Sequence, residues 1–211
     1  MRKRWNRTTP VVNLSLNELT ELIQSPFPGD SVVGFQMTTG GLANTNIRLE
    51  LAKHATPILL RLFVRDAAQA QKECRLLELL QDTVPVPRVL YFSPQNHISG
   101  HPLLLLDWVE GQIFEDRLEG CSIKDIGAIA NSIGESLAAI HSYKFESCGF
   151  FGEDLSIATP ITICGAGLLE YANECLITKG GISILGPQIT KDVLFFLEPV
   201  SYTHLRAHET K

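Results

Sequence analysis

Residues 57–64 constrain the fold more than any other segment, because they place one charge inside an apolar, strand-like run. The run reads Pro-Ile-Leu-Leu-Arg-Leu-Phe-Val, and Arg61 is its only ionisable residue. A guanidinium in such surroundings is destabilising unless a carboxylate pairs with it. Glu73, on the helical segment that follows, is the nearest acid expected to face an apolar surface. We therefore predict an ion pair between the Arg61 strand and the Glu73 helix.

The helix that carries Glu73 is predicted to begin at a cap formed by Asp66 and to end near Gln81. Residues three and four positions apart share one face of a helix. Glu73 is therefore expected to share the apolar stripe of this helix, which we place at Leu76, Leu77 and Leu80.

Strands surround this helix in the sequence. Residues 45–51 alternate cleanly, with Ile47, Leu49 and Leu51 on one side, which is typical of a half-buried antiparallel strand. Further strands are expected at residues 31–37, 57–64, 88–92 and 103–106.

Helices are expected on both sides of the strand-rich region. Ser15 and Glu18 form a capping-box pattern that predicts a short helix before the first strand. Ser122 and Asp125 indicate a second capped helix, which reaches His141. Residues 168–176 and 190–197 are predicted to be helical as well. The order indicates an α+β fold: an antiparallel β lobe with one inserted helix, a linker near 107–121, and a helical lobe. The stripe of the second capped helix, expected to need a covering lobe, is Ile126, Ile129, Ile133, Leu137 and Ile140.

Composition excludes several classes of protein. The chain has 211 residues, of which 45% are hydrophobic, so it can build a core. Its net charge is −5, and its only cationic cluster is at residues 2–4 and 7, which we interpret as a solvated terminus rather than a nucleic-acid site. No apolar run is long enough for a membrane helix. Five widely spaced cysteines without a C-x-x-C motif argue against disulfides and zinc, and favour a cytoplasmic protein.

The hairpin at residues 38–46 is a candidate phosphate-binding loop. Its adjacent glycines, Gly40 and Gly41, would let the backbone approach a phosphate, and Asn44 and Thr45 follow them. An ordinary hairpin turn is the alternative. The pattern is neither a P-loop nor a dinucleotide-binding glycine motif, because it lacks a following Gly-Lys-Ser/Thr and does not open a helix.

Arg61 is the candidate phosphate-binding cation. Its planar guanidinium could grip two phosphate oxygens as a fork, while Glu73 would aim it. The alternative places Arg61 at the edge of the sheet with its charge in solvent, and Glu73 on the flank of the helix.

The connector after residues 103–106 is a candidate base-binding segment. Exposed backbone groups of Asp107, Trp108 and Val109 could bind adenine at a junction between lobes, unless the segment is a simple linker. His141 is interpreted as a core or capping histidine rather than a catalytic one.

Several motifs, in this order, resemble the aminoglycoside phosphotransferase family over residues 30–155. The resemblance implies a protein-kinase-like fold and ATP-dependent phosphorylation of a small-molecule hydroxyl. Arg61 would then take the place usually held by a phosphate-binding lysine. The motifs are Gly40-Gly41-Leu42-Ala43-Asn44, Leu59-Leu60-Arg61-Leu62, Glu73-Cys74-Arg75-Leu76-Leu77, Val84-Pro85-Val86-Pro87-Arg88-Val89, Leu104-Leu105-Leu106-Asp107-Trp108-Val109-Glu110-Gly111, Leu137-Ala138-Ala139-Ile140-His141 and Cys148-Gly149-Phe150-Phe151-Gly152.

The resemblance also implies domains. Residues 1–29 would be an N-terminal extension with a short helix, and residues 30–109 the nucleotide-binding β lobe. Residues 110–199 would begin an incomplete helical lobe, and residues 200–211 are interpreted as a tail derived from an adapter or vector. ATP, a small-molecule hydroxyl substrate and, for the complete protein only, Mg²⁺ are the expected ligands. Nucleic acid and membrane are not expected, and the acceptor and the oligomeric state stay open.

The catalytic motif of the family is missing. Phosphotransferases of this kind use a His-x-Asp…Asn loop and a later metal-binding aspartate, and no His-x-Asp occurs in this chain. We therefore assign no catalytic residue and expect the chain as given to be an inactive N-terminal part of a phosphotransferase. One alternative is a complete, pseudokinase-like nucleotide-binding or interaction module. The other is an unrelated α+β domain in which Arg61 is purely structural.

Sequencing of the native transcript across codons 195 to 215 and beyond tests the truncation hypothesis. We expect the native frame to continue into a His-x-Asp…Asn loop with a later aspartate. A genuine stop after Lys211 would contradict it and favour the non-catalytic module.

Overall fold

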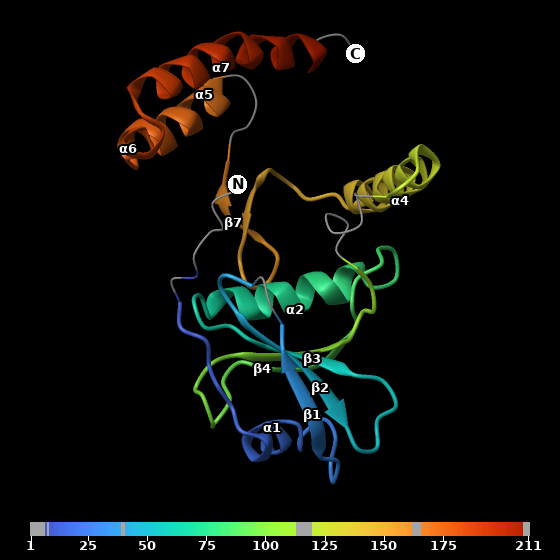
Figure 1. The fold of residues 1–211 in the computed structure, drawn as a ribbon. Helices are drawn as coiled ribbons and strands as arrows, with labels where there is room; N and C mark the ends of the chain where they lie inside the picture. The colour runs from blue at the N-terminus through green and yellow to red at the C-terminus, as the bar shows by residue number, and fades with distance from the viewer. Residues whose placement is uncertain (1–6, 8, 39–40, 113–119, 162–165, 209–211) are drawn as a thin grey trace. The chain divides into compact units, whose positions relative to one another are not determined.

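The computed structural model describes residues 7, 9–38, 41–112, 120–161 and 166–208. These residues form two compact units (Figure 1). The first is Met1–Lys144 with Glu153–Leu155, and the second is Phe145–Gly152 with Ser156–Lys211.

The first unit is built around an antiparallel sheet, as the sequence predicted. Its strands lie in the order β1-β2-β3-β5-β4, so β3 is the central strand. Every neighbouring pair is antiparallel, which confirms the α+β class. The strands are β1 (Val32–Met37), β2 (Thr45–Leu51), β3 (Ile58–Leu62), β4 (Val89–Ser93) and β5 (Leu103–Asp107).

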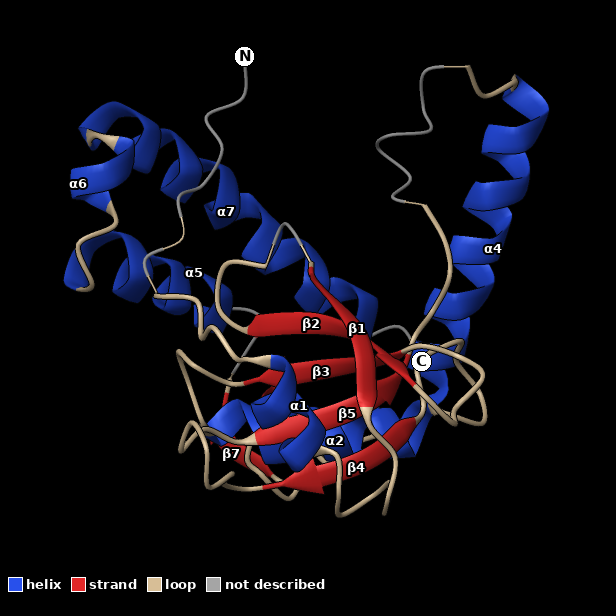
Figure 2. Ribbon diagram, turned by 60° about the horizontal axis from the view of Figure 1, so that its bottom comes forward, coloured by secondary structure: helices blue, strands red, loops and turns tan. Residues whose placement is uncertain are grey.

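Two helices cover opposite faces of the sheet (Figure 2). The strand period of two sends Leu103 and Leu105 to the core beside α1 (Leu16–Leu22). It sends Leu104 and Leu106 to the core beside α2 (Ala68–Leu80). All four leucines are at most 1% exposed, so β5 is apolar on both sides because both of its sides are covered.

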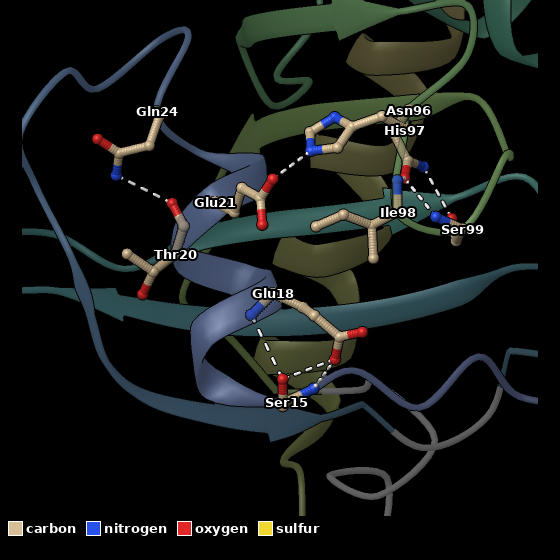
Figure 3. A network of polar contacts seen from close by, with 9 residues as sticks. All are labelled: Ser15, Glu18, Thr20, Glu21, Gln24, Asn96, His97, Ile98 and Ser99. Carbon is tan, nitrogen blue, oxygen red and sulfur yellow. Dashed lines mark hydrogen bonds and ion pairs between the residues drawn. The ribbon is translucent and has the colours of Figure 1, made fainter.

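Helix α1 is capped as predicted, and Figure 3 shows the contacts around it. The Ser15 hydroxyl accepts the Glu18 N–H, and the Glu18 carboxylate accepts the Ser15 N–H at 2.8 Å. Glu21 of the same helix pairs with His97 Nε2 at 2.6 Å, which ties α1 to the turn between β4 and β5. Asn96 is buried and braces that turn, because its Oδ1 accepts the Ser99 N–H at 2.7 Å.

Helix α2 begins two residues after Asp66, whose carboxylate accepts the Ala68 N–H at 3.1 Å. The predicted apolar stripe was wrong in part. Ala70 and Cys74 are the buried positions, whereas Leu76 and Leu80 are only half-buried. The small side chains face the sheet because they let the helix approach the strands closely.

Helix α4 (Ile123–Ser142) has the predicted capping box between Ser122 and Asp125. It has no buried residue, and His141 is exposed in its last turn. Of the two predicted positions for His141, the core position was therefore wrong, whereas its place at the end of the helix agrees with the capping alternative. A basic residue there suits the negative end of the helix dipole. Four stripe residues are 40–50% exposed, and these are Ile126, Ile133, Leu137 and Ile140.

The second unit contains a hairpin that the sequence analysis missed, followed by helices. The strands β6 (Gly149–Phe151) and β7 (Ile157–Pro160) pair antiparallel. A Cβ on Gly149 would lie 2.4 Å from Ile157, so the hairpin needs glycine there. None of the described helices combines the length and apolarity that a membrane span requires. The helical elements are α5 (Ala166–Asn173), a π-helical turn (Glu174–Thr178), α6 (Ile182–Leu185) and α7 (Pro187–His208).

The packing of α2 predicts an order of cysteine reactivity. Burial and, to a lesser extent, the nearby Glu78 carboxylate together raise the pKa of the Cys74 thiol to about 11. The reactive thiolate of Cys74 is therefore scarce and covered at pH 8, whereas Cys148 is exposed. In native alkylation mapped by mass spectrometry, we expect Cys148 to react well before Cys74. Equal rates would show that α2 does not stay packed on the sheet.

Candidate functional site

The predicted ion pair is present. Arg61 Nη1 bonds to Glu73 Oε1, and the two side chains are 25% and 29% exposed. Arg61 lies on the central strand β3, so the alternative position at the sheet edge was wrong. Burial lowers the pKa of Arg61 from its ordinary value, but an arginine in an ion pair stays charged. The pair therefore presents an oriented, partly accessible cation on the α2 face of the sheet.

Asn46 is a third member of this group that the sequence analysis missed. It stands opposite Arg61 in the β2–β3 register, so the two side chains share a face. Arg61 Nε donates to Asn46 Oδ1 at 2.9 Å. The polar positions of the alternating strand 45–51 contained this signal, but the register between β2 and β3 was needed to use it.

The β1–β2 loop lies directly beside Asn46. Gly41 is so close to it that a Cβ there would lie 3.1 Å from Asn46 Nδ2. Thr45 is 1% exposed, which places its side chain on the buried face of β2. Gly40 lies outside the described residues. The carbonyls of Gly41 and Asn44 both accept bonds from Arg7, so the expected solvated terminus was wrong at Arg7.

A cavity of about 250 Å³ joins two of the predicted elements. Asn44 of the loop and Glu73 of α2 both line it, so the loop and the ion pair open onto the same space. Arg65 supplies a second cation that the sequence analysis did not single out. The other lining residues are Ala43, Asp66 and Gln69.

The connector after β5 is only partly available for a ligand. The Asp107 N–H donates to the Arg88 carbonyl at 3.0 Å, so this backbone donor is already used. Val109 is 64% exposed. Trp108 lies under the Arg48 guanidinium, 5.5 Å from ring centroid to carbon. The buried Trp108 Nε1 has no hydrogen-bond partner among the described residues.

Arg48 and Glu50 extend the polar row that Asn46 begins on β2. They alternate with the buried leucines and isoleucine of the strand, and they form an ion pair of 2.5 Å. Arg48 pairs in register with Leu59 of β3 and lies over Trp108, so it links the row to the connector. This pair was also missed from sequence, because a surface ion pair is the ordinary interpretation of such residues.

A second cavity, of about 470 Å³, lies in the second unit. Its lining is mainly apolar and comes from α5 to α7, with Leu169, Ile177 and Leu194 among its residues. It contains none of the predicted site residues. The candidate site is therefore the α2 face of the sheet in the first unit.

The role of Asn46 gives a stability test. Asn46→Ala removes the acceptor of Arg61 Nε and should lower the free energy of unfolding by about 1–2 kcal/mol. Asn46→Asp keeps an acceptor for Arg61 Nε and should therefore retain most of the stability that Asn46→Ala loses. Gln36→Ala, at an exposed position of the edge strand β1, is the control and should change the free energy of unfolding by less than about 0.5 kcal/mol. Urea unfolding measures all three, and an unchanged Asn46→Ala would contradict the contact.

Comparison with known proteins identifies a family over the part of the chain that contains the candidate site. The model of the phosphotransferase enzyme family matches residues 36–158, which include β2, β3, α2 and the connector. No curated protein matches the chain in sequence at a significant level.

Solved structures show the same fold at low identity. The GDP complex of an aminoglycoside 2′-phosphotransferase IIIa variant has a TM-score of 0.60 at 22% identity, over 90% of this chain and 59% of that one. A GDP and kanamycin complex of the aminoglycoside phosphotransferase APH(2″)-IIIa has a TM-score of 0.58 at 22% identity. The match covers 88% of this chain and 59% of that one.

A ternary complex of APH(4)-Ia with AMP-PNP and hygromycin B has a TM-score of 0.52 at 15% identity, over 68% and 46%. The chain thus spans about half to three fifths of the length of these proteins. The sheet, its inserted helix and these similarities define a protein-kinase-like fold, and the chain belongs to the phosphotransferase enzyme family.

Proposed function

We propose that residues 30–109 are the nucleotide-binding lobe of an ATP-dependent phosphotransferase that acts on a small-molecule hydroxyl. The observation that carries the proposal is the Arg61–Glu73 ion pair on the central strand, beside the β1–β2 loop. Kinases hold ATP phosphates with a cation that a helix glutamate orients, below a glycine-bearing loop. Arg61, Glu73 and the loop at Gly41 supply these parts.

Arg61 would contact the phosphate oxygens directly. The described contacts use its Nε and one terminal nitrogen, and the side chain remains a quarter exposed. Asn46 and Glu73 fix the plane of the guanidinium from two sides. A fork held in one plane loses less conformational entropy on binding than a free arginine. Gly41, Asn44 and Thr45 would contribute backbone N–H groups from the loop.

The base would lie at the connector. Val109 is exposed there, and Trp108 presents a ring already covered by Arg48. A purine could stack on this pair or displace Arg48 from the ring. The similar structures contain GDP or AMP-PNP, which supports nucleotide binding in general.

Phosphoryl transfer needs groups beyond this lobe. The described residues contain no cluster of three acids, histidines or cysteines that fits a metal ion, so no step through Mg²⁺ is assigned to them. The sequence has no His-x-Asp motif. We therefore propose that this chain binds nucleotide without transferring phosphate, and that Mg²⁺ belongs to the complete protein. The complete protein is proposed to be cytoplasmic.

A non-catalytic, pseudokinase-like module is the second candidate. The same elements without the catalytic motif favour it. Nucleotide binding that is tight without Mg²⁺ would distinguish it from a kinase part, in which Mg²⁺ neutralises the phosphates.

Removal of the Arg61 charge tests the proposed site. Arg61→Met should weaken binding of a fluorescent ATP analogue by about tenfold or more, because a desolvated phosphate contact is lost. Arg61→Lys should keep part of the affinity. Arg75→Gln changes the same charge on the exposed side of α2 and should leave binding unchanged.

Circular dichroism of each variant would show that it is folded. Wild-type affinity in folded Arg61→Met would overturn the role of Arg61 and favour a purely structural arginine.

A further inference from the structure

We propose that Arg7 is a positioning residue that holds the β1–β2 loop in its phosphate-binding orientation. The proposal rests on the function proposed above, and it assigns the N-terminal segment a part in nucleotide binding. The segment lies before the region matched by the family model.

Arg7 binds the loop through its guanidinium, and we call this set of hydrogen bonds the clasp. Nη1 donates to the Gly41 carbonyl at 2.9 Å and to the Asn44 carbonyl at 2.8 Å. Nη2 lies 3.4 Å from the Thr45 hydroxyl oxygen. One side chain therefore holds two carbonyls of the loop and reaches them across more than thirty residues of sequence. Arg7 is half-buried, unlike a solvated terminal residue.

The segment that carries Arg7 is itself anchored. Arg7 Nε donates to the Thr9 carbonyl at 2.5 Å, which folds the side chain back along its own segment. The Val12 N–H donates to the Thr45 hydroxyl at 3.1 Å. Leu14 is 9% exposed in the core beside α1. These contacts fix the position from which Arg7 reaches the loop.

Arg7 approaches from the face opposite Arg61. Thr45 has the same parity on β2 as Ile47, which belongs to the core beside α1. Asn46 and Arg61 point to the α2 face. The clasp therefore leaves the side of the loop that faces Arg61 uncovered by Arg7.

The clasp also orients the peptide groups of the loop. In a trans peptide, the C=O and the following N–H point in opposite directions. Because the Gly41 carbonyl points to Arg7, the Leu42 N–H points away from it. Phosphate binding needs loop N–H groups turned to the ligand and carbonyls turned away. Arg7 holds both carbonyls on the far side.

Electrostatics favours the same role. Among the described residues, Arg7 donates to the neutral backbone acceptors of Thr9, Gly41 and Asn44. A positive charge behind the loop adds to the field that attracts phosphate. Gly41 also lies beside Asn46, the partner of Arg61, because a Cβ on Gly41 would lie 3.1 Å from Asn46 Nδ2. A shift of the loop toward Asn46 would therefore disturb the Arg61 contact as well.

The test compares Arg7→Gln and Arg7→Lys with a matched control. The control is Lys53→Gln. Lys53 follows β2 and also donates to a backbone carbonyl, that of Gly29. Its replacement removes the same charge at a place remote from the β1–β2 loop. Two quantities are measured on the full chain. The first is amide hydrogen exchange at residues 41–46 without nucleotide, and the second is affinity for ATP.

For Arg7→Gln we expect exchange in the loop to be faster and ATP affinity to be weaker, each by about tenfold, the size expected for one or two lost hydrogen bonds. Arg7→Lys keeps the charge but loses the forked guanidinium. It should therefore give loop exchange and ATP affinity between those of the wild type and of Arg7→Gln. Lys53→Gln should change neither quantity, and all variants should keep the far-ultraviolet circular dichroism of the wild type.

The outcomes separate this inference from the proposed function. Unchanged loop exchange in Arg7→Gln overturns the clasp whether or not the wild type binds ATP. Faster exchange with unchanged ATP affinity shows a structural brace and overturns the positioning role. A wild type that binds no ATP overturns the proposed function and with it the ligand part of this inference, while the exchange result still decides the clasp.

Discussion

The burial of one guanidinium on the central strand is the constraint on which the site depends. Arg61 has apolar neighbours on its strand and on β5, where it stands opposite Leu104. A cation in such a position destabilises the fold unless acceptors surround it. Glu73 from α2 and Asn46 from β2 supply them. The guanidinium that is proposed to bind phosphate therefore also links α2, β2 and β3 to one another.

This arrangement requires a sheet that is covered on both faces. The alternate residues of β3 and β5 enter two separate cores, one beside α1 and the other beside α2. Helix α1 closes one face with large side chains, those of Leu19 and Leu22. Helix α2 approaches the other face through Ala70 and Cys74, which are small. That close approach brings the neighbouring Glu73 within bonding distance of Arg61.

The sequence predicted what depends on local pattern. Period-two alternation located β2, capping residues located α1 and α4, and the energetic cost of a lone buried charge predicted the Arg61–Glu73 pair. Contacts that depend on register or on distant segments were missed. Asn46 becomes a partner of Arg61 only when the β2–β3 alignment is known. Arg7 reaches its carbonyls across the whole of β1, and no local pattern distinguishes it from a solvated basic residue. The short hairpin β6–β7 has too few residues to show alternation.

The contacts form a continuous path from the N-terminal segment to α2. Arg7 bonds to Gly41, Gly41 lies beside Asn46, Asn46 accepts from Arg61, and Arg61 bonds to Glu73. Residues 41–44 belong to neither core and are held in this path by the side chain of Arg7. A phosphate bound between the loop and Arg61 would contact the path at its middle and stabilise both halves. The same bound phosphate would then stabilise both the N-terminal segment and α2. Neither of these elements would have to form the whole phosphate site by itself.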